Sequence, residues 1–347
     1  MELLDSSDGN LKKAGAALAR GQLVAFPTET VYGLGANVFD ERAVARIFEA
    51  KARPNFDPLI VHIASADMID GVAVLPNERA RALVEKLWPG PLTLILPKNP
   101  RIPDLATAGL ATVAVRFPSN IVAQKIIRYA GLPIAAPSAN PFGYLSPSTA
   151  KHVVDFLGDK VDIIVDGGPC EIGVESTILD VTQEPARVLR PGGMPVEAIE
   201  EIIGTVTIGA AMAVDKNGKP LGQKSPGQLK SHYAPHTPLY LLDSGAVLDF
   251  DPRGKAVALV FGSKDEAKLR GSALASRFVR IMNLSERGDF LEASASLFTI
   301  LHRLDLEDLD EIWVERLPER SLGRAVNDRL YKASYKDGRA PLRGARG

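Results

Sequence analysis

The chain has 347 residues, of which 46% are hydrophobic and 24% are charged, and its formal net charge is −1 at pH 7. These values are typical of a soluble globular protein with two domains, and they exclude an overall basic field of the kind that binds nucleic acid. The single cysteine, Cys170, excludes an internal disulfide framework, and no apolar run reaches the ~20 residues that span a bilayer. The N-terminus lacks the features of a signal peptide, so we predict a cytoplasmic protein that does not contact membranes.

The first part of the chain alternates short apolar runs with segments of helical periodicity. Helices are predicted where apolar residues recur every three or four positions, at 10–20, 41–51, 77–88, 121–129, 149–157 and 195–203. Strands are predicted for the short β-rich runs at 23–26, 59–63, 92–96, 112–117, 132–136, 161–165, 176–181 and 186–189. This alternation predicts an α/β sheet. The close succession of the last three strands suggests antiparallel pairs, so the sheet should be mixed.

A connector and a smaller unit follow. Residues from about 204 to 238 are rich in Gly, Pro, Lys and small residues, and no amphipathic period lasts long there, so we interpret them as a connector. A second α/β series follows, with strands expected at 239–242, 257–261, 278–282 and 312–314 and helices at 291–304 and 324–333. The domains are therefore expected at 1–205, 206–238 and 239–347.

The segment Pro27–Gly35, PTETVYGLG, follows the first of these strands, and we interpret it as a loop that leads to a helix near Asp40. Open α/β sheets place ligand sites at the carboxyl ends of strands. The loop offers two Thr hydroxyls, a Glu carboxylate, a Tyr hydroxyl and two glycines that allow close backbone approach. For this loop alone, a tight turn with incidental polar residues is an equally good interpretation.

Polar segments also follow other strands, and four cations lie near strand or helix ends. The polar segments are PSAN (137–140), EST (175–177) and RPGG (190–193), and the cations are Lys51, Arg53, Arg116 and Arg190. If these segments converge, they form a pocket suited to phosphate-bearing and carboxylate-bearing ligands. The sequence contains no nucleophile–base pair, phosphate loop or zinc motif, so the chemistry should rest on positioning and charge neutralisation.

Several of these residues have simpler interpretations. Lys51 and Arg53 could interact with a helix C-terminus, and a strand histidine such as His62 is more often packed in a core than bound to a ligand. Arg116 lies within an apolar strand, where a buried guanidinium needs a partner, either a ligand anion or a structural carboxylate.

Two further groups have structural interpretations. Ser138 and Asn140 could merely cap the segment that follows them. Near the C-terminus, Asn327, Asp328 and Arg329 lie on a predicted helix, where a solvated face is the better interpretation.

Eight motifs occur in a fixed order: PTET-x-YGLG (27–35), K-x-RP (51–54), PLIVHI (58–63), WPGP-x-T (88–93), VAVRFP (113–118), PSAN (137–140), ESTI (175–178) and RPG (190–192). Over roughly residues 10–205, this combination resembles the threonylcarbamoyl-AMP synthase family. SPG (225–227), HYAP (232–235) and GRAVNDRL (323–330) resemble the linker and C-terminal domain of its longer members. The resemblance implies an N-terminal YrdC-like mixed twisted sheet with helices around a central cavity. It also implies a small C-terminal Rossmann-like α/β domain.

The resemblance also implies a reaction. A nucleotidyltransferase of this family would convert ATP, L-threonine and bicarbonate into threonylcarbamoyl-AMP and pyrophosphate. Mg²⁺ would accompany the triphosphate, with no protein side chain assigned as its ligand. The product would supply N6-threonylcarbamoyladenosine at position 37 of tRNA through a separate transferase. That transferase machinery is a possible partner, and direct nucleic-acid binding is expected to be weak or absent.

By the same resemblance, each motif contributes to one of two substrate sites. L-threonine would contact Thr30, His62, Arg116, Ala136 and Ser176, with Arg116 as the fork for the carboxylate. ATP would contact Lys51, Arg53, Asp57, Thr112, Ser138, Asn140, Ser146, Arg190 and Tyr233. The catalytic cations would be Lys51, Arg53 and Arg116. Tyr233 would reach back from the linker, which would close as a flap over the nucleotide. Phe142 stands where many members have Ser, so this chain has no hydroxyl at that position.

Two other functions remain open. One is an RNA-binding or ribosome-associated module that uses the cation-lined surface, although the net charge of −1 does not favour it. The other is a different carbamoyl-adenylate-forming enzyme, similar to those of hydrogenase maturation. The chain lacks the acylphosphatase-like and zinc-finger segments of those larger proteins.

Overall fold

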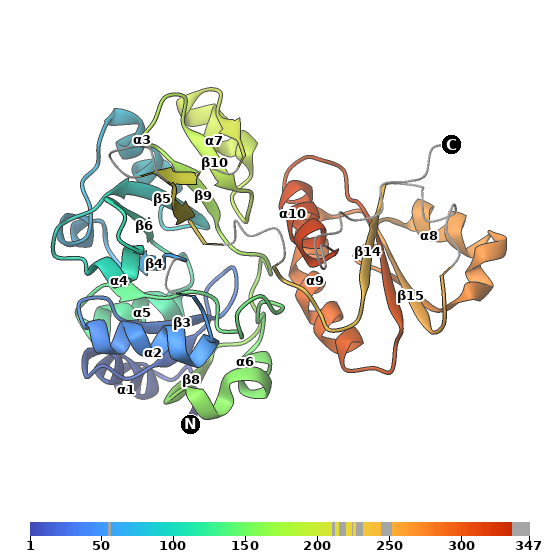
Figure 1. The fold of residues 1–347 in the computed structure, drawn as a ribbon, viewed down its shortest axis with the longest axis horizontal. Coiled ribbons are helices and arrows are strands. Elements are labelled where there is room, and N and C mark those ends of the chain that lie inside the picture. The colour runs from blue at the N-terminus through green and yellow to red at the C-terminus, as the bar shows by residue number, and fades with distance from the viewer. Residues whose placement is uncertain are drawn as a thin grey trace. The chain divides into compact units, whose positions relative to one another are not determined.

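The computed structural model describes residues 1–54, 57–209, 212–214, 220–223, 225–226, 232–243 and 252–334. Contacts divide the chain into two compact units, drawn in Figure 1. The first comprises Met1–Phe142, Ser146–Glu171 and Glu175–Gln228, and the second comprises Gly143–Leu145, Ile172–Val174 and Leu229–Gly347. Within the described ranges, no helix has the length and hydropathy needed to cross a bilayer.

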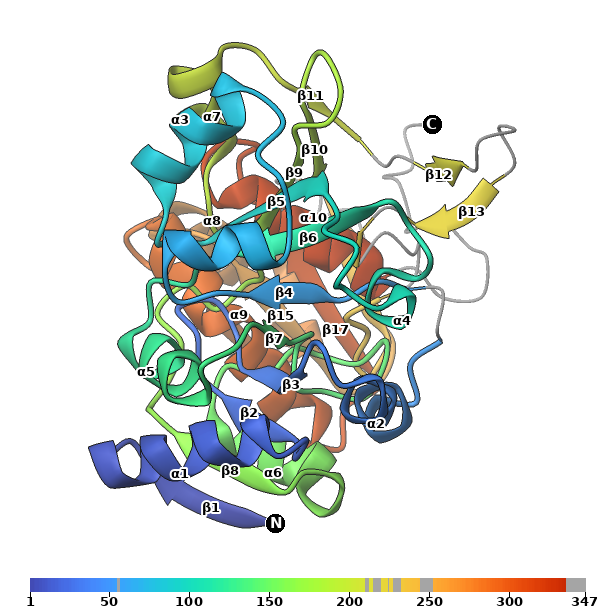
Figure 2. The same cartoon turned by 90° about the vertical axis from the view of Figure 1, so that its left-hand side faces the viewer.

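The first unit is built on a mixed sheet, which has eleven strands among the described residues. In spatial order they are β1 (Glu2–Asp5), β8 (Ile163–Asp166), β2 (Val24–Phe26), β3 (Gly33–Asn37), β7 (Ile134–Ala135), β4 (Ile60–His62), β6 (Thr112–Arg116), β5 (Leu92–Pro97), β9 (Thr177–Asp180), β10 (Arg187–Arg190) and β11 (Thr207–Ile208). Figure 2 shows this order from β1 at the bottom to β11 at the top. The pairs β4–β6 and β5–β9 are parallel, whereas β5–β6 and β9–β10 are antiparallel, which confirms the predicted mixed sheet.

Helices that the periodicity predicts cover this sheet, with a few short additions. They are α1 (Asp8–Ala19), α2 (Glu41–Lys51), α3 (Glu78–Leu87), α4 (Asp104–Thr107), α5 (Ile121–Ala130), α6 (Ala150–Leu157) and α7 (Val196–Ile203), with 3-10 turns at Ala66–Gly71 and Gly158–Lys160. Helix α2 has the predicted bounds because both ends are defined locally. The Asp40 carboxylate accepts hydrogen bonds from the amides of Arg42 and Ala43, and Ala52 ends the helix at a φ of 51°.

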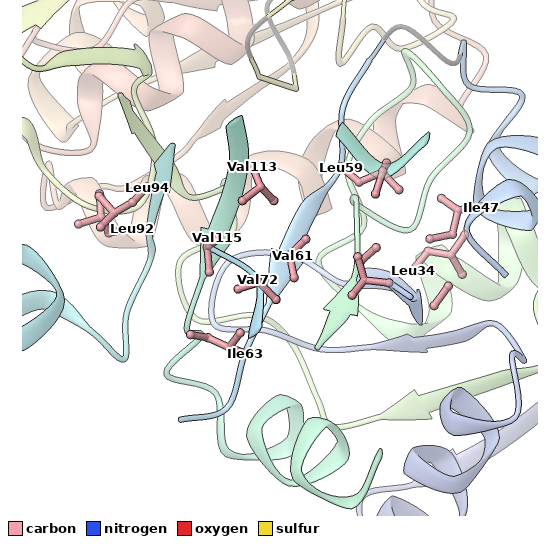
Figure 3. Packing of buried hydrophobic residues seen from close by; sticks show 14 of the residues in the cluster. Leu34, Ile47, Leu59, Val61, Ile63, Val72, Leu92, Leu94, Val113 and Val115 are labelled. Atoms are coloured by element: carbon pink, nitrogen blue, oxygen red, sulfur yellow. The ribbon is translucent and has the colours of Figure 1, made fainter. Parts of the chain in front are cut away.

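The two faces of the central strands have different compositions. Val61 of β4 and Val115 of β6 contribute to the main hydrophobic cluster, as Figure 3 shows. Because successive side chains of a strand alternate between faces, His62 and Arg116 must lie on the opposite face. Toward β5 and β9 that face has a small apolar cluster, formed by Ile60, Ile95, Ala114, Ile178 and Leu189. Toward β7 and β2, Ile134, which is in register with His62, belongs to a larger apolar cluster shared with α1 and α5. The sheet therefore buries polar side chains beside this small cluster.

Three features of the first unit correct or extend the sequence-based expectations. The segment Gly33–Asn37 is strand β3 rather than part of a loop. Its glycines allow close packing, since a Cβ on Gly35 would lie 2.6 Å from Phe26 Cε1. Strand β8 pairs with β1 and β2 instead of joining β9 and β10. The connector also contains regular structure, namely β11 and a hairpin of β12 (Met212–Val214) and β13 (Pro220–Gln223).

The second unit contains a four-stranded parallel sheet in its described residues, in the order β14 (Leu239–Leu242), β17 (Glu311–Glu315), β15 (Ala256–Val260) and β16 (Phe278–Asn283). Its helices are α8 (Ser263–Arg270), α9 (Phe290–Asp305) and α10 (Gly323–Ser334), with a 3-10 turn at Ala273–Arg277. A parallel sheet with connecting helices confirms the predicted small Rossmann-like α/β fold. Helix α8 lacks an apolar face broad enough for periodicity to reveal it, because Leu269 is its only buried residue.

The interpretation of Asn327–Arg329 as a solvated helix face is wrong. Asn327 is buried, and its amide donates to Leu317 O at 2.7 Å and to Glu319 Oε1 at 2.8 Å. Arg329 is also buried, with its guanidinium carbon 5.1 Å from the centre of the Tyr233 ring. The polar composition of the helix conceals this burial, because hydrogen bonds of Asn327 and the cation–π contact of Arg329 compensate much of the loss of hydration.

Asp305, at the end of α9, joins separate segments of the second unit. Its carboxylate accepts hydrogen bonds from the Tyr144 hydroxyl at 2.7 Å and the Thr237 amide at 2.8 Å, and it lies 2.9 Å from His236 Nδ1. Burial alone would raise the pKa of Asp305, but the hydrogen bonds from Thr237, Tyr144 and His236 outweigh it and hold the pKa below 3.8. The charged carboxylate therefore stabilises the second unit.

Replacing Asp305 with asparagine should reduce the free energy of unfolding by about 1–3 kcal/mol at pH 7. A folded-state pKa below the unfolded-state value means that this contribution is present above pH 3.8 and is lost as the pH falls through the folded-state pKa. Melting curves of the two proteins should therefore differ at pH 7 and converge in acid. Asp308→Asn is a matched control, because its ion pair with Lys255 is exposed. A difference between wild type and Asp305→Asn that does not change with pH would contradict the proposed charge effect.

Candidate active site

A row of polar side chains crosses the less apolar face of the sheet. In the strand register, His62 of β4 is paired with Arg116 of β6, and Arg116 with Thr93 of β5. Ile178 of β9 comes next and is paired with Arg190 of β10. Residues in register lie on the same face of a sheet. We call His62, Arg116, Thr93 and Arg190 the polar row. Two residues that the sequence assigns to threonine and one that it assigns to ATP thus lie on one sheet face.

Arg116 is the central member of the polar row and bonds to the PTET segment. Its Nη1 donates to Thr30 Oγ1 at 2.8 Å, and its Nη2 lies 2.8 Å from Glu29 Oε1. The sequence left open whether Arg116 pairs with a ligand anion or with a structural carboxylate, and the structure shows the carboxylate of Glu29. Sequence reasoning did not assign Glu29 to the site, although two signals were present: the carboxylate in PTET and the need of a buried arginine for an anion.

His62 is buried next to Arg116. Burial, and then the charge of Arg116, lower the pKa of His62 to about 3, so its imidazole is neutral at pH 7. Its Nδ1 lies 3.3 Å from the carbonyl oxygen of Ile60 in the same strand. A neutral imidazole adds no charge beside Arg116 and can still form hydrogen bonds.

Ser176 connects the other half of the polar row. Its hydroxyl lies 2.7 Å from Thr93 Oγ1, and its carbonyl oxygen accepts hydrogen bonds from Arg190 Nε at 3.2 Å and Nη2 at 3.0 Å. The RPG turn approaches this segment closely, because a Cβ on Gly192 would lie 2.3 Å from Glu175 O. Glycine is therefore required at position 192 to bring Arg190 and Ser176 together.

Lys51 connects helix α2 to the PSAN segment. Its ammonium donates to Ser138 O at 2.6 Å and also to the carbonyl oxygen of Asn140. Phe142 N donates back to Lys51 O at 2.8 Å. Burial, and then the charge of Arg53, hold the pKa of Lys51 well below 10.5. The simple interpretation of Lys51 as a cation at its own helix end is therefore wrong, because this side chain holds a distant segment.

A second buried ion pair lies near Lys51. Arg53 Nη2 is 2.9 Å from Asp57 Oδ2 and 2.9 Å from Pro58 O, and both charged side chains are buried. Burial raises the pKa of Asp57, against the lowering effect of Arg53, Lys51 and Arg190. The positive charges of these three residues favour the ionised form of Asp57, whereas burial favours its protonated form.

The other residues assigned to threonine or ATP lie in different parts of the structure. Ala136 is buried after β7 and donates its amide to Ile60 O at 2.9 Å. The Ser146 hydroxyl donates to the Glu175 carboxylate, beside Ser176. Thr112 lies at the opposite end of β6 from Arg116. Tyr233 belongs to the second unit, so its reach toward the nucleotide stays a prediction. Residues 210–211, 215–219, 224 and 227–231 of the predicted flap lie outside the described residues.

The structure also has a surface hollow of about 300 Å³ that contains none of the predicted site residues. It is lined by Leu23, Arg46, Glu49, Ala50 and Lys160. The buried cations Arg116 and Arg190 lie elsewhere, in the polar row.

Two family profiles match the chain in succession. The family described as Telomere recombination matches residues 16–192, and the family described as Threonylcarbamoyl-AMP synthase, C-terminal domain, matches residues 194–334. The threonylcarbamoyl-AMP synthase of Pyrococcus abyssi is 44% identical over 326 residues, which cover 93% of this chain and 94% of that protein. The threonylcarbamoyl-AMP synthase of Bacillus subtilis is 38% identical over 338 residues, which cover 95% and 94% of the two chains.

A solved structure agrees with these sequence matches. The crystal structure of P. abyssi Sua5 complexed with L-threonine has a TM-score of 0.84 and 39% identity to this chain, and the match covers 96% of this chain and 98% of the other. Fold, motifs and full-length relatives therefore agree along nearly the whole sequence. This chain belongs to the threonylcarbamoyl-AMP synthase family of nucleotidyltransferase enzymes.

Proposed function

We propose that this chain forms threonylcarbamoyl-AMP and pyrophosphate from ATP, L-threonine and bicarbonate at the polar face of the first unit. The observation that carries this proposal is the burial of four cations, Lys51, Arg53, Arg116 and Arg190, which are only 1% to 7% exposed. Arg116 and Arg53 each face one protein carboxylate, and Lys51 and Arg190 donate to carbonyl oxygens. Buried cations need compensating negative charge, and the carboxylate of threonine and the triphosphate of ATP would supply more of it.

The threonine end of the site lies around Arg116. The guanidinium of Arg116 binds the substrate carboxylate as a fork, and Thr30, which bonds to Arg116, is placed to contact the same substrate. His62 and Ser176 supply neutral hydrogen-bonding groups on either side, and the small side chain of Ala136 completes the threonine site. The side chains around Arg116 thus provide charge for the carboxylate and polar groups for the rest of the amino acid.

The nucleotide end of the site lies around Lys51, Arg53 and Arg190. These cations neutralise charge on the triphosphate as pyrophosphate leaves. The polar groups assigned to the nucleotide are Asp57, Thr112, Ser138, Asn140, Ser146 and Tyr233. No protein nucleophile is needed. The deprotonated amine of threonine bonds to the carbon of CO₂ with loss of a proton, or to that of bicarbonate with loss of water, and a carbamate oxygen then attacks the α-phosphorus as pyrophosphate leaves. Burial of the site protects the unstable carbamate from water.

We also propose that Mg²⁺ binds together with ATP. The described residues contain no group of three or more His, Cys, Asp or Glu side chains that could hold a metal ion. The carboxylate of Asp57 is paired with Arg53, and that of Glu175 accepts from Ser146. The residues present therefore fit a metal that is held chiefly by the triphosphate. When bound, Mg²⁺ would supply charge neutralisation at the leaving pyrophosphate.

The setting of the reaction in the cell is a further part of the proposal. The product is a reactive mixed anhydride, so a transferase that modifies tRNA must take it up directly or soon after release. We expect the chain to act in the cytoplasm, where ATP and tRNA are available, and to bind RNA weakly or not at all.

Measurement of pyrophosphate release tests the proposed reaction. The full chain is mixed with ATP and Mg²⁺, and L-threonine and bicarbonate are omitted in turn. Pyrophosphate should form at a substantial rate only when both are present, because the carbamate is the attacking group. Release that does not depend on threonine would overturn the proposal. A salt-dependent shift of tRNA without any such release would favour the RNA-binding alternative.

Replacing Ser138 with alanine should weaken ATP binding by about 0.5–1.5 kcal/mol, the value of one ordinary hydrogen bond. The backbone of Ser138 is fixed by Lys51, so removal of the hydroxyl should leave the PSAN segment in place. Calorimetry with ATP measures the change. Ser276→Ala serves as a control, because its hydroxyl is exposed on the second unit. Equal ATP affinity in wild type and Ser138→Ala would count against the placement of this residue.

A further inference from the structure

Glu29 is a buried carboxylate that the proposed reaction does not yet use. Its side chain is 3% exposed, and its one close charged neighbour among the described residues is Arg116, at 2.8 Å. That contact lacks hydrogen-bond geometry. In the described part of the chain, both carboxylate oxygens of Glu29 therefore lack a hydrogen-bond donor, and Nε and Nη2 of Arg116 lack an acceptor.

Burying these groups without hydrogen-bond partners costs free energy of folding. A buried carboxylate without hydrogen bonds loses its hydration, and its attraction to one guanidinium repays that loss only in part. The neighbouring residues of the segment are satisfied, since the Thr28 hydroxyl bonds to Thr30 at 2.8 Å and to Val31 O at 2.7 Å. In this segment and its Arg116 partner, the unsatisfied side-chain atoms are thus concentrated on Glu29 and Arg116; at the nucleotide end, the carboxylate of Asp57 beside Arg53 likewise lacks hydrogen-bond donors among the described residues. Such a concentration in an otherwise satisfied segment indicates a place where a ligand supplies the missing partners.

We propose that Glu29 binds the α-amino group of the amino-acid substrate while Arg116 binds its carboxylate. This inference rests on the proposed function, because it deepens the threonine end of the same site. An α-amino acid has its ammonium and carboxylate on one carbon atom. A receptor for it needs an anion and a cation side by side, as Glu29 and Arg116 are. The unmet acceptors then face the ammonium and the unmet donors face the carboxylate.

The arrangement explains two properties that the reaction requires. Glu29 orients the nitrogen that attacks the carbon of CO₂ or bicarbonate once the bound ammonium has lost a proton, so it acts as a substrate-binding residue at the reacting atom. It also selects α-amino acids over α-hydroxy acids. A hydroxyl group carries no charge, so it does not compensate the buried carboxylate as an ammonium does.

Calorimetry with two ligands tests the role of Glu29. The ligands are L-threonine and (2S,3R)-2,3-dihydroxybutanoate, in which a hydroxyl replaces the amine. Wild type should bind L-threonine at least about tenfold more tightly, the lower end for a hydrogen bond to a charged group. Glu29→Gln should bind threonine about 10–100-fold more weakly, whereas its affinity for the hydroxy acid should change little. The preference for threonine over the hydroxy acid should therefore be largely lost.

The controls separate this role from a structural one. If Glu29 only positions Arg116, Glu29→Gln should lower the affinity for both ligands equally, and that result would overturn the proposal. An unchanged affinity for threonine would overturn it as well. Glu85→Gln is the matched control, because Glu85 is exposed on α3. ATP affinity reports whether each variant is folded. If Glu29→Gln is misfolded, Glu29→Asp gives the same comparison, with discrimination again expected to fall. Wild type that binds no threonine at all would refute the proposed function itself, a result distinct from failure of the Glu29 assignment.

Discussion

Replacing Arg116 with alanine should abolish detectable threonine binding while ATP binding largely persists. The guanidinium is the cation at the centre of the polar row, and it is held by Thr30 and Glu29 rather than by the PSAN segment. Loss of a buried, charge-assisted fork costs about 3–5 kcal/mol, which corresponds to a loss of more than 100-fold in affinity. Calorimetry with L-threonine and with ATP, in separate titrations, measures the two effects.

The variant also leaves the Glu29 carboxylate buried without its cation, so stability must be measured in parallel. Arg116→Lys keeps the charge and removes the fork, and it should still weaken threonine binding because lysine does not pair bidentately with a carboxylate. Arg81→Ala, an exposed position on α3, is the matched control and should behave as wild type. Normal threonine affinity in a folded Arg116→Ala protein would refute the assigned role.

Replacing Lys51 with methionine should reduce pyrophosphate formation by at least about 100-fold, as expected when a positioned cation is lost from a transition state. The same change removes the donor to the carbonyl groups of Ser138 and Asn140. Each carbonyl that is left unsatisfied costs about 1–3 kcal/mol. We therefore expect a fall in melting temperature together with the loss of activity. Both are measured on the same preparation, by calorimetry and by pyrophosphate release.

The two effects of Lys51 can be distinguished. Lys51→Arg retains a cation with several donors, so it should recover most of the stability but little of the rate, because the larger group alters the geometry beside Arg53. Lys86→Met, on the exposed face of α3, should alter neither quantity. Full activity in Lys51→Met would show that Lys51 only holds the PSAN segment and takes no part in the reaction.

Local sequence patterns predict much of the fold because they depend on near neighbours in the chain. The apolar spacing of α2, its Asp40 cap and its end at Ala52 are all local, and the predicted bounds equal those observed. The alternation of β6 likewise predicts that Arg116 and its neighbour Val115 face opposite sides of a strand. Prediction fails for Gly33–Gly35, because the glycines that indicate a loop are the residues that let β3 pack between β2 and β7.

The candidate site depends more strongly on tertiary structure. The motifs identify the chemical groups, including Arg116, Lys51 and Arg190, and they indicate the family that the comparisons confirm. Sequence does not reveal that Lys51 is bonded to a segment 87 positions away or that Arg116 is paired with Glu29. The reason is that the order of strands in the sheet differs from their order in the chain, and contacts between distant segments leave no local periodicity. The sequence by itself determined most of the helices and strands and the set of reactive groups, whereas only the tertiary structure decided which of those groups contact one another in the buried interior.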